Sequence, residues 1–104
     1  MGRSVAPVFA ALGDETRLRL VSRLSTGGPL SITTLAAGLP MTRQAITKHL
    51  RVMEAAGLVR AEVRGRESLW RLEERRLALA ARHLRAISSE WDARLGRLKR
   101  LVER

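Results

Sequence analysis

Five polar residues that could contact nucleic acid fall at helical spacing in MTRQAITKHLRVMEAAGLV, residues 41–59. At about 100° per residue they share one arc of roughly 140°, formed by Arg43, Gln44, Thr47, Lys48 and Arg51. The opposite side is apolar and carries Ala45, Ile46, Val52, Met53 and Ala56, with Leu50 on the border. The pattern predicts an amphipathic helix with a polar front.

The chemistry of this front matches the edges of DNA bases and the phosphate backbone. Arg and Lys can contact guanine or phosphate, Gln can contact adenine, and Thr can contact phosphate or the thymine methyl group. Thr42 is the expected N-cap, and the helix N-terminus itself favours a phosphate. The first acidic residue is Glu54, whereas an ordinary solvated face would mix both signs of charge. A plain solvent-exposed face is the alternative, and we favour a major-groove reading surface.

A second basic element follows at Arg64-Gly65-Arg66, between two stretches of alternating apolar and charged residues. The alternation predicts a β-hairpin with Gly65 in its turn. The tip can reach a neighbouring minor groove or its phosphates, or it can be an ordinary charged turn. Glu62 and Glu67 lower its net charge, so we expect it to position the protein rather than to read bases.

Metal chemistry has little support in the sequence. There is no cysteine, so neither a disulfide nor a thiolate site can form. His83 has Glu90 and Asp92 downstream but no second histidine at ligand spacing, and a zinc site needs three or four ligands. His49 lies on the apolar side of its helix, which favours a structural or phosphate-reaching role over a metal ligand or a pH switch. We therefore predict no metal and no cofactor.

The elements that must position these residues follow from capping signals and periodicity. Asp14, Ser31 and Thr42 are expected N-caps, and Gly13, Gly28, Gly38 and Gly57 lie where helices end. Leu18, Val21 and Leu24 mark the apolar spacing of the second helix. The predicted order is helices over 5–12, 14–25, 31–39 and 42–56, strands over 58–63 and 67–72, and a helix over 74–104. A helix-turn-helix followed by a hairpin is a winged helix-turn-helix, mainly α with a small hairpin, in one domain spanning 1–104.

The last helix carries an apolar stripe with Leu77, Leu84 and Trp91 at seven-residue spacing. A helix of about 30 residues runs roughly 45 Å, more than a small domain covers, so we expect it to pair with its own copy. Its first half can also fold back on the core. The predicted dimer interface comprises Val8, Phe9, Leu12, Leu77, Leu84, Ile87, Trp91, Leu95 and Leu98.

Composition sets the class of partner. The 104 residues carry a net charge of +10, and 18 of the 20 basic residues are arginine. Such an excess predicts attraction to nucleic acid first and to anionic membrane second. No catalytic triad, phosphate loop or paired carboxylate indicates an enzyme. There is no apolar run of membrane-spanning length, and residues 1–12 lack the features of a secretory signal, so we expect a cytoplasmic protein.

Three stretches resemble the ArsR/SmtB-type winged-helix repressors of bacteria: ALGDETRLRLVSRL (residues 11–24), SITTLAAGLPMTRQAITKHLRVMEAAGLV (residues 31–59) and GRESLWRL (residues 65–72). The resemblance implies a recognition helix over residues 43–55, operator contacts from Thr47, Lys48 and their neighbours, and a homodimer built from the first and last helices. Metal-sensing members carry Cys pairs or Asp, His and Glu clusters that this chain lacks, so it is more similar to the metal-independent branch.

We therefore predict a sequence-specific DNA-binding regulator, a homodimeric repressor (or autorepressor) at an inverted-repeat operator. The predicted DNA-contacting residues are Ser31, Thr42, Arg43, Gln44, Thr47, Lys48, Arg51, Arg64, Gly65 and Arg66. Two alternatives stay open at this point. One is a ligand- or metal-responsive derepressor of the same type, and the other is a basic amphipathic protein of a membrane surface.

Overall fold

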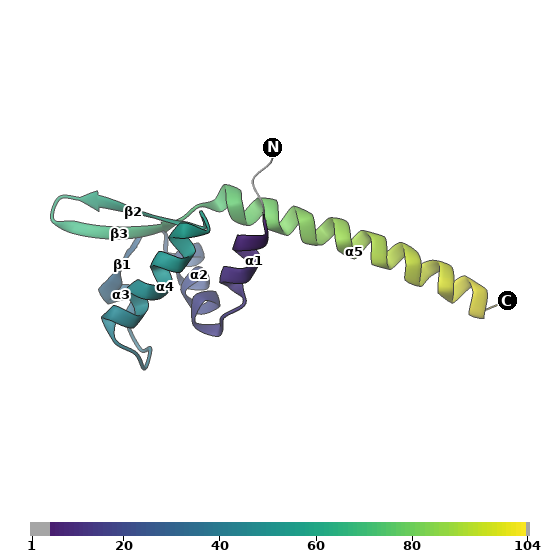
Figure 1. Cartoon of the computed structure of the whole chain (residues 1–104), viewed down its shortest axis with the longest axis horizontal. Coiled ribbons are helices and arrows are strands. Elements are labelled where there is room, and N and C mark those ends of the chain that lie inside the picture. The colour runs from purple at the N-terminus through teal and green to yellow at the C-terminus, as the bar shows by residue number, and fades with distance from the viewer. Residues whose placement is uncertain (1–4, 104) are drawn as a thin grey trace.

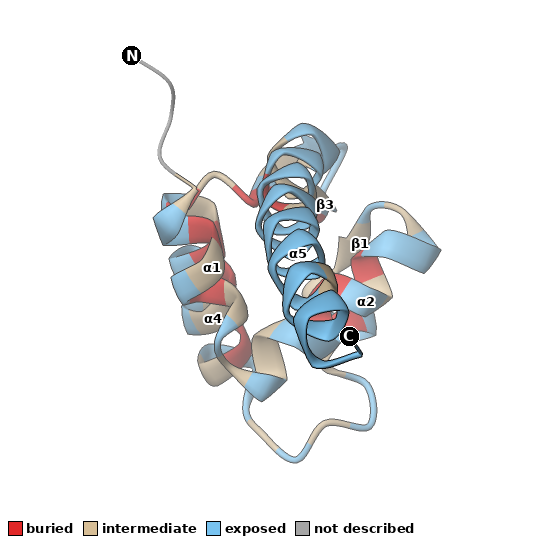
Figure 2. Cartoon of the chain, turned by 90° about the vertical axis from the view of Figure 1, so that its right-hand side faces the viewer, coloured by how far each residue is buried: buried red, intermediate tan, exposed pale blue. Residues whose placement is uncertain are grey.

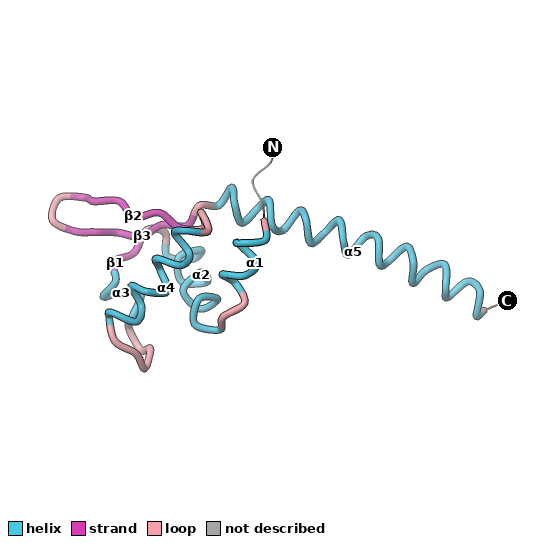
Figure 3. Tube along the Cα trace, in the orientation of Figure 1, coloured by secondary structure: helices cyan, strands magenta, loops and turns pink. Residues whose placement is uncertain are grey.

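The computed structural model describes residues 5–103 and forms a small body from which one helix extends (Figure 1). The elements in chain order are α1 (Ala6–Leu12), α2 (Glu15–Gly27), β1 (Leu30–Ser31), α3 (Ile32–Ala36), α4 (Arg43–Ala55), β2 (Val59–Arg64), β3 (Glu67–Leu72) and α5 (Glu74–Val102). Their arrangement along the chain is seen in Figure 3. The predicted order of helices and hairpin is confirmed; Arg104, the last residue of the predicted final helix, lies outside the described residues.

The predicted helix caps explain where the helices begin. Asp14, Ser31 and Thr42 each accept a hydrogen bond at the side chain from the backbone N–H three residues on, at Arg17, Thr34 and Ala45 respectively. Each cap satisfies one of the backbone donors that the first turn of a helix leaves free. Gly57 follows α4 with a φ of +78°, a conformation that residues with a Cβ rarely adopt. These local signals set the boundaries of the helix-turn-helix.

The sheet has three antiparallel strands in the order β1-β3-β2, one more than predicted. β2 and β3 form the expected hairpin, whose last pair is Arg64 with Glu67 around Gly65 and Arg66. The short β1 pairs Leu30 with Trp70 and Ser31 with Leu69. The sequence did not indicate β1, because two residues show no period and their strand character comes from pairing with a distant segment.

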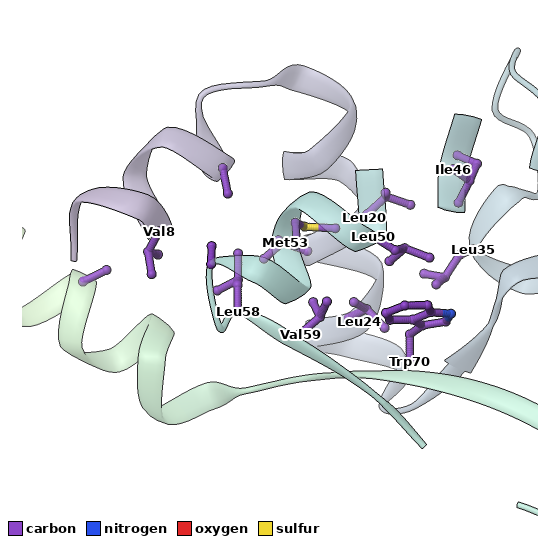
Figure 4. Close-up of a cluster of buried hydrophobic side chains, with 14 residues drawn as sticks. Val8, Leu20, Leu24, Leu35, Ile46, Leu50, Met53, Leu58, Val59 and Trp70 are labelled. Carbon is purple, nitrogen blue, oxygen red and sulfur yellow. The ribbon is translucent and has the colours of Figure 1, made fainter. Parts of the chain in front are cut away.

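One apolar core joins α1, α2, α3, α4 and the sheet (Figure 4). Leu20, Leu35, Ile46, Leu50, Met53 and Leu58 are fully buried in it, and Trp70 lies over it from β3. The expectation that Leu18 belongs to the apolar face of α2 is wrong, since Leu18 is exposed and Leu20 takes its place. The packed face of α2 is centred between Leu20 and Leu24, and Leu18 lies more than a quarter turn from it.

Helix α5 leaves the body and extends as a single rod (Figures 1 and 2). The described chain measures 67 × 35 × 20 Å along its principal axes, so the rod accounts for its elongation. Only the first turns of α5 pack on the body: Ala80 is buried, and Leu77 and Ala81 are half-buried. In the described part of the chain, no helix is long and apolar enough to cross a membrane.

Candidate nucleic-acid interface

Helix α4 is held so that its polar arc faces outward. Ile46, Leu50 and Met53 of α4 are fully buried, which fixes the rotation of the helix about its axis. Arg43, Gln44, Lys48 and Arg51 are therefore exposed, and Thr47 is half-buried. Its hydroxyl donates to the carbonyl of Arg43 at 2.9 Å, which leaves its lone pairs and methyl group available.

The expectation that Val52 lies on the buried side of α4 is wrong, because its side chain is 45% exposed. The buried face is centred on Ile46 and Met53, and Val52 lies about a third of a turn from that centre. The apolar face of α4 is thus narrower than the sequence pattern suggested.

The five residues of the arc differ in whether their side chains already have protein partners. Arg43 donates to the hydroxyl of Thr33 in α3. Arg51 pairs with Glu54 at 2.9 Å, and its guanidinium lies 5.3 Å from the ring centroid of Trp70. Within residues 5–103, the side chains of Gln44 and Lys48 make no hydrogen bond or ion pair. Gln44 and Lys48 are therefore the two members of the arc whose side chains have no protein partner to give up when a ligand binds.

The turn between α3 and α4 is held from behind by Arg23 of α2. Its Nη1 donates to the carbonyls of Leu35 and Ala37, at 2.7 and 2.6 Å. Carbonyls at a helix C-terminus have no partner within the helix, and the guanidinium satisfies two of them at once. Gly38 follows with a φ of +77°. The orientation of α4 relative to α3 thus depends on a side chain from a third helix.

A polar contact between α2 and α4 surrounds His49, consistent with the predicted structural role. Arg17 donates from Nη1 to Nδ1 of His49 at 3.3 Å and from Nε to the carbonyl of Ala11 at 2.5 Å. The carboxylate of Asp14 lies 3.8 Å from the same ring nitrogen. The backbone N–H of Arg17 hydrogen-bonds the Asp14 carboxylate and, with the charges of Arg17 and His49, lowers the pKa of Asp14.

The hairpin tip extends beyond the core, as the exposure of Val63 shows. Arg64 pairs with Glu62 at 2.8 Å, whereas Arg66 has no ion pair within the described residues. Gly65 adopts a φ of +63° and has open space around it. Of the three predicted tip residues, Arg66 is thus the cation free to meet a phosphate.

A shallow groove lies between the hairpin and the helix-turn-helix, next to the start of α4. It is lined by Ser31, Ile32, Thr33, Thr34, Arg43, Glu67 and Ser68. Ser31 caps α3, and its Oγ lies 3.2 Å from Oγ1 of Thr34. The structure thereby brings two predicted contact residues, Ser31 and Arg43, to one polar surface beside the hairpin.

Three arginines with structural roles were not found from the sequence. Arg17, Arg23 and Arg76 each donate to a backbone carbonyl, at Ala11, at Leu35 and Ala37, and at Ala56. Their partners lie between 6 and 20 residues away, and no local pattern links such pairs. Part of the basic excess therefore stabilises the fold, and the net charge overstates the number of residues available for DNA.

The predicted dimer residues divide into buried and bare groups. Val8 is only 1% exposed and belongs to the core of the single chain, because that face of α1 packs on α2 and α4. Phe9, Leu12 and Leu77 are half-buried against the core, and the Phe9 ring lies 6.0 Å from that of His83. The exposed group comprises Leu84, Ile87, Trp91, Leu95 and Leu98.

No cluster of three or more potential metal ligands occurs in the described chain.

Known proteins that resemble this chain in sequence are transcriptional regulators with a helix-turn-helix domain. Residues 12–62 match the helix-turn-helix domain family. The chain is 38% identical over 76 residues to the HTH-type transcriptional regulator Rv2034 of Mycobacterium tuberculosis, covering 73% of this chain and 70% of that protein. It is 30% identical over 95 residues to the arsenical resistance operon repressor of Escherichia coli, covering 91% and 79%.

Solved structures agree with the fold. An ArsR-like transcriptional regulator from Rhodococcus superposes with a TM-score of 0.76 at 43% identity, covering 93% of this chain and 91% of that one. A homodimeric winged helix-turn-helix DNA-binding domain from Mycobacterium bovis superposes with a TM-score of 0.66 over 83% of this chain and 79% of its own. At 23% identity, the second likeness concerns the fold alone.

Proposed function

Since this chain belongs to the ArsR-like family of helix-turn-helix transcriptional regulators, a class without enzymatic activity, we propose that it represses transcription as a homodimer at an inverted-repeat operator. The observation that carries the proposal is the outward arc of α4, which lacks acidic residues before Glu54 and keeps Gln44 and Lys48 free of protein partners. We expect the protein to act in the cytoplasm, where such an operator would lie.

In the proposed complex, α4 enters the major groove, and its side chains make different kinds of contact with the DNA. Gln44 and Lys48 read bases or phosphate, and Arg43 and Thr47 support them at the start of the helix. Ser31 and Thr42 lie beside the sugar-phosphate backbone of the DNA. Within the protein, their hydroxyls cap the first turns of α3 and α4. Arg66, with Gly65 allowing close approach, meets a neighbouring phosphate. Arg51 pairs with Glu54 within α4 and lies over Trp70 of β3, and Arg64 pairs with Glu62 within β2. Both arginines therefore contribute mainly through contacts inside the protein.

The homodimer is supported by the exposed part of α5. Leu84, Trp91 and Leu98 lie on one face of the rod and are more than half exposed in the protomer. A contiguous apolar face of this length is rare on a monomer. A twofold pair through α1 and α5 would cover it and would present two α4 helices to major grooves about 34–36 Å apart. Repression is proposed because an E. coli relative carries that name.

The proposal is tested by selecting bound duplexes from a random pool with the purified protein. We expect enrichment of an imperfect inverted repeat whose half-sites lie about one helical turn apart. Lys48→Ala should weaken binding to the selected duplex while sedimentation and circular dichroism stay those of the wild type. A pool without enrichment, or an unchanged affinity of Lys48→Ala, would contradict the assignment of α4 as the reading element.

A further inference from the structure

We propose that Glu62 raises sequence specificity by holding Arg64 of the hairpin tip away from DNA phosphates. This rests on the function proposed above and gives Glu62 a positioning role in it. Both residues belong to β2, and Nε of Arg64 donates to Oε2 of Glu62 at 2.8 Å. The side chain of Arg64 is 62% exposed, whereas that of Glu62 is 27% exposed. The arginine is thus at the surface, and the carboxylate that holds it is partly sheltered.

The contact turns the guanidinium of Arg64 back towards the body. Side chains two residues apart on a strand lie on the same face, and Glu62 is the one farther from the tip. Another carboxylate is available at the tip itself, because Glu67 lies directly across the hairpin from Arg64. Within residues 5–103, however, Glu67 makes no ion pair. Arg64 therefore pairs with the carboxylate that draws it away from the tip.

Glu62 is itself held by a second arginine on the neighbouring strand. Nε of Arg71 lies 3.6 Å from Oε1 of Glu62, and Nη2 of Arg71 lies 3.6 Å from Oε1 of Glu73. Nε of Arg60 lies 3.5 Å from the same oxygen of Glu73. Basic and acidic side chains thus alternate from the tip to the residue before α5. Charges in a network are better fixed than an isolated surface pair, so Glu62 is a stable anchor for Arg64.

The two elements proposed to contact DNA share a division between free and held cations. The hairpin projects from the body (Figure 1), and its tip carries Arg64 held by Glu62 and Arg66 with no ion pair in the described chain. In α4, Arg51 pairs with Glu54 at 2.9 Å, and Lys48 has no such partner among the described residues. The number of cations ready to meet phosphate is therefore smaller than the number on the surface.

Holding a cation back affects arbitrary sequences more than the operator. Binding to arbitrary DNA depends almost entirely on phosphate contacts, and no base contact fixes the position of the protein on it. The protein can therefore shift along the backbone until its free cations meet phosphates. On the operator, base contacts from α4 fix the position, so Arg64 gains a contact only where a phosphate already lies within reach. The Glu62 carboxylate thus weakens non-specific binding more than specific binding.

The salt dependence of binding to a duplex of scrambled sequence tests this role. Glu62→Gln keeps the shape of the side chain but removes the charge that holds Arg64. The slope of log affinity against log salt concentration should steepen by about 2 for a dimer, because each protomer gains one phosphate contact. The affinity for the scrambled duplex should rise about tenfold at low salt, and the affinity for the selected operator should rise less. Fluorescence anisotropy measures both, and equal gains on the two duplexes would overturn the role in specificity.

Glu67→Gln is the matched control. It removes the same charge from the same hairpin tip but breaks no ion pair, so the slope should stay close to that of the wild type. A second control places Glu62→Gln in a chain that also carries Arg64→Gln, where it should add no further change in slope. If Glu67→Gln steepens the slope as much as Glu62→Gln, or if Glu62→Gln acts equally without Arg64, the carboxylate acts through its own charge and the proposal is overturned.

A double variant covers the transfer of Arg64 from one carboxylate to the other. Glu62 and Glu67 are the only acidic residues between positions 60 and 71. The chain with both Glu62→Gln and Glu67→Gln therefore leaves Arg64 without a carboxylate on the hairpin, and it should show the steeper slope even if Glu67 captures Arg64 in the single variant. A wild-type slope in the double variant would overturn the proposal.

The two proposals fail separately. If the wild type prefers its selected operator and the Glu62 variants bind both duplexes as the wild type does, only the role of Glu62 is wrong. If the wild type binds the operator and the scrambled duplex equally well, or binds neither, the proposed function is wrong.

Discussion

At the scale of single residues, the polar arc of α4 contains two kinds of cation. Lys48 has no protein partner among the described residues, whereas Arg51 is held by Glu54 and the face of Trp70. A cation over an aromatic ring at an exposed site contributes about 0.5–1 kcal/mol, so this contact stabilises the Arg51 guanidinium in its position over Trp70. Position on a helical wheel therefore does not decide which side chains are available for DNA.

The salt dependence of operator binding should separate Lys48 from Arg51. Each neutralised phosphate contributes about 0.9 to the slope of log affinity against log salt concentration. Lys48→Gln should flatten this slope by about 2 for a dimer, because each protomer loses one contact. Arg51→Gln should lower the affinity with little change in slope. Fluorescence anisotropy at several salt concentrations measures both, and equal slope changes would show that Arg51 contacts phosphate as Lys48 does.

The lowered pKa of Asp14 predicts how stability depends on acid. A carboxyl group whose pKa lies below its ordinary value of 3.8 stabilises the fold above that pH, and the contribution is lost as the pH falls below it. Asp14→Asn keeps a good N-cap but removes the charge beside Arg17 and His49. The variant should be less stable than the wild type at pH 7, and the gap in urea midpoints should shrink towards pH 3. A gap that is the same at both pH values would rule out this role.

At the scale of elements, the sequence predicted what depends on neighbours along the chain. The caps at Asp14, Ser31 and Thr42 and the turn at Gly65 are local signals, and the helices and the hairpin follow from them. Strand β1 depends on pairing with Trp70, some 40 residues away, and was missed. The predicted buried places of Leu18 and Val52 were wrong because periodicity gives a direction but not the width of the covered face.

The candidate site, too, was predicted only in part from the sequence. The arc of α4 followed from its composition, but the structure was needed to show which side chains are already paired. The roles of Arg17, Arg23 and Arg76 could not be predicted, because their carbonyl partners come close only after the helices have packed.

The junction between α4 and β2 should be sensitive to a single methyl group. Gly57 has a φ of +78°, and a Cβ there would lie 2.9 Å from Cζ of Arg76, whose Nη1 donates to the carbonyl of Ala56. Gly57→Ala should therefore lower the free energy of unfolding by about 1–2 kcal/mol. Gly65→Ala is the control, since it has a similar φ but open space, and should cost less. Thermal unfolding measures both, and equal losses would mean that Arg76 moves aside freely.

At the scale of the whole molecule, the proposed dimer makes operator geometry a prediction. Two α4 helices related by a twofold axis approach one face of the duplex, so their half-sites must keep a fixed rotation about the DNA axis. Five base pairs inserted between the half-sites turn one of them to the far side of the duplex. Binding should then fall to the level of a single half-site in a mobility-shift assay. An unchanged affinity would mean that the two reading heads are not rigidly joined.

The bare apolar face of α5 has a consequence for dosage. If only the paired form covers that face and grips both half-sites, the quantity that matters to a promoter is the square of the concentration of free chains. A modest fall in synthesis would then release the promoter abruptly, and a modest rise would close it. An autorepressor that dimerises through α5 would keep its own concentration near the dissociation constant of its dimer.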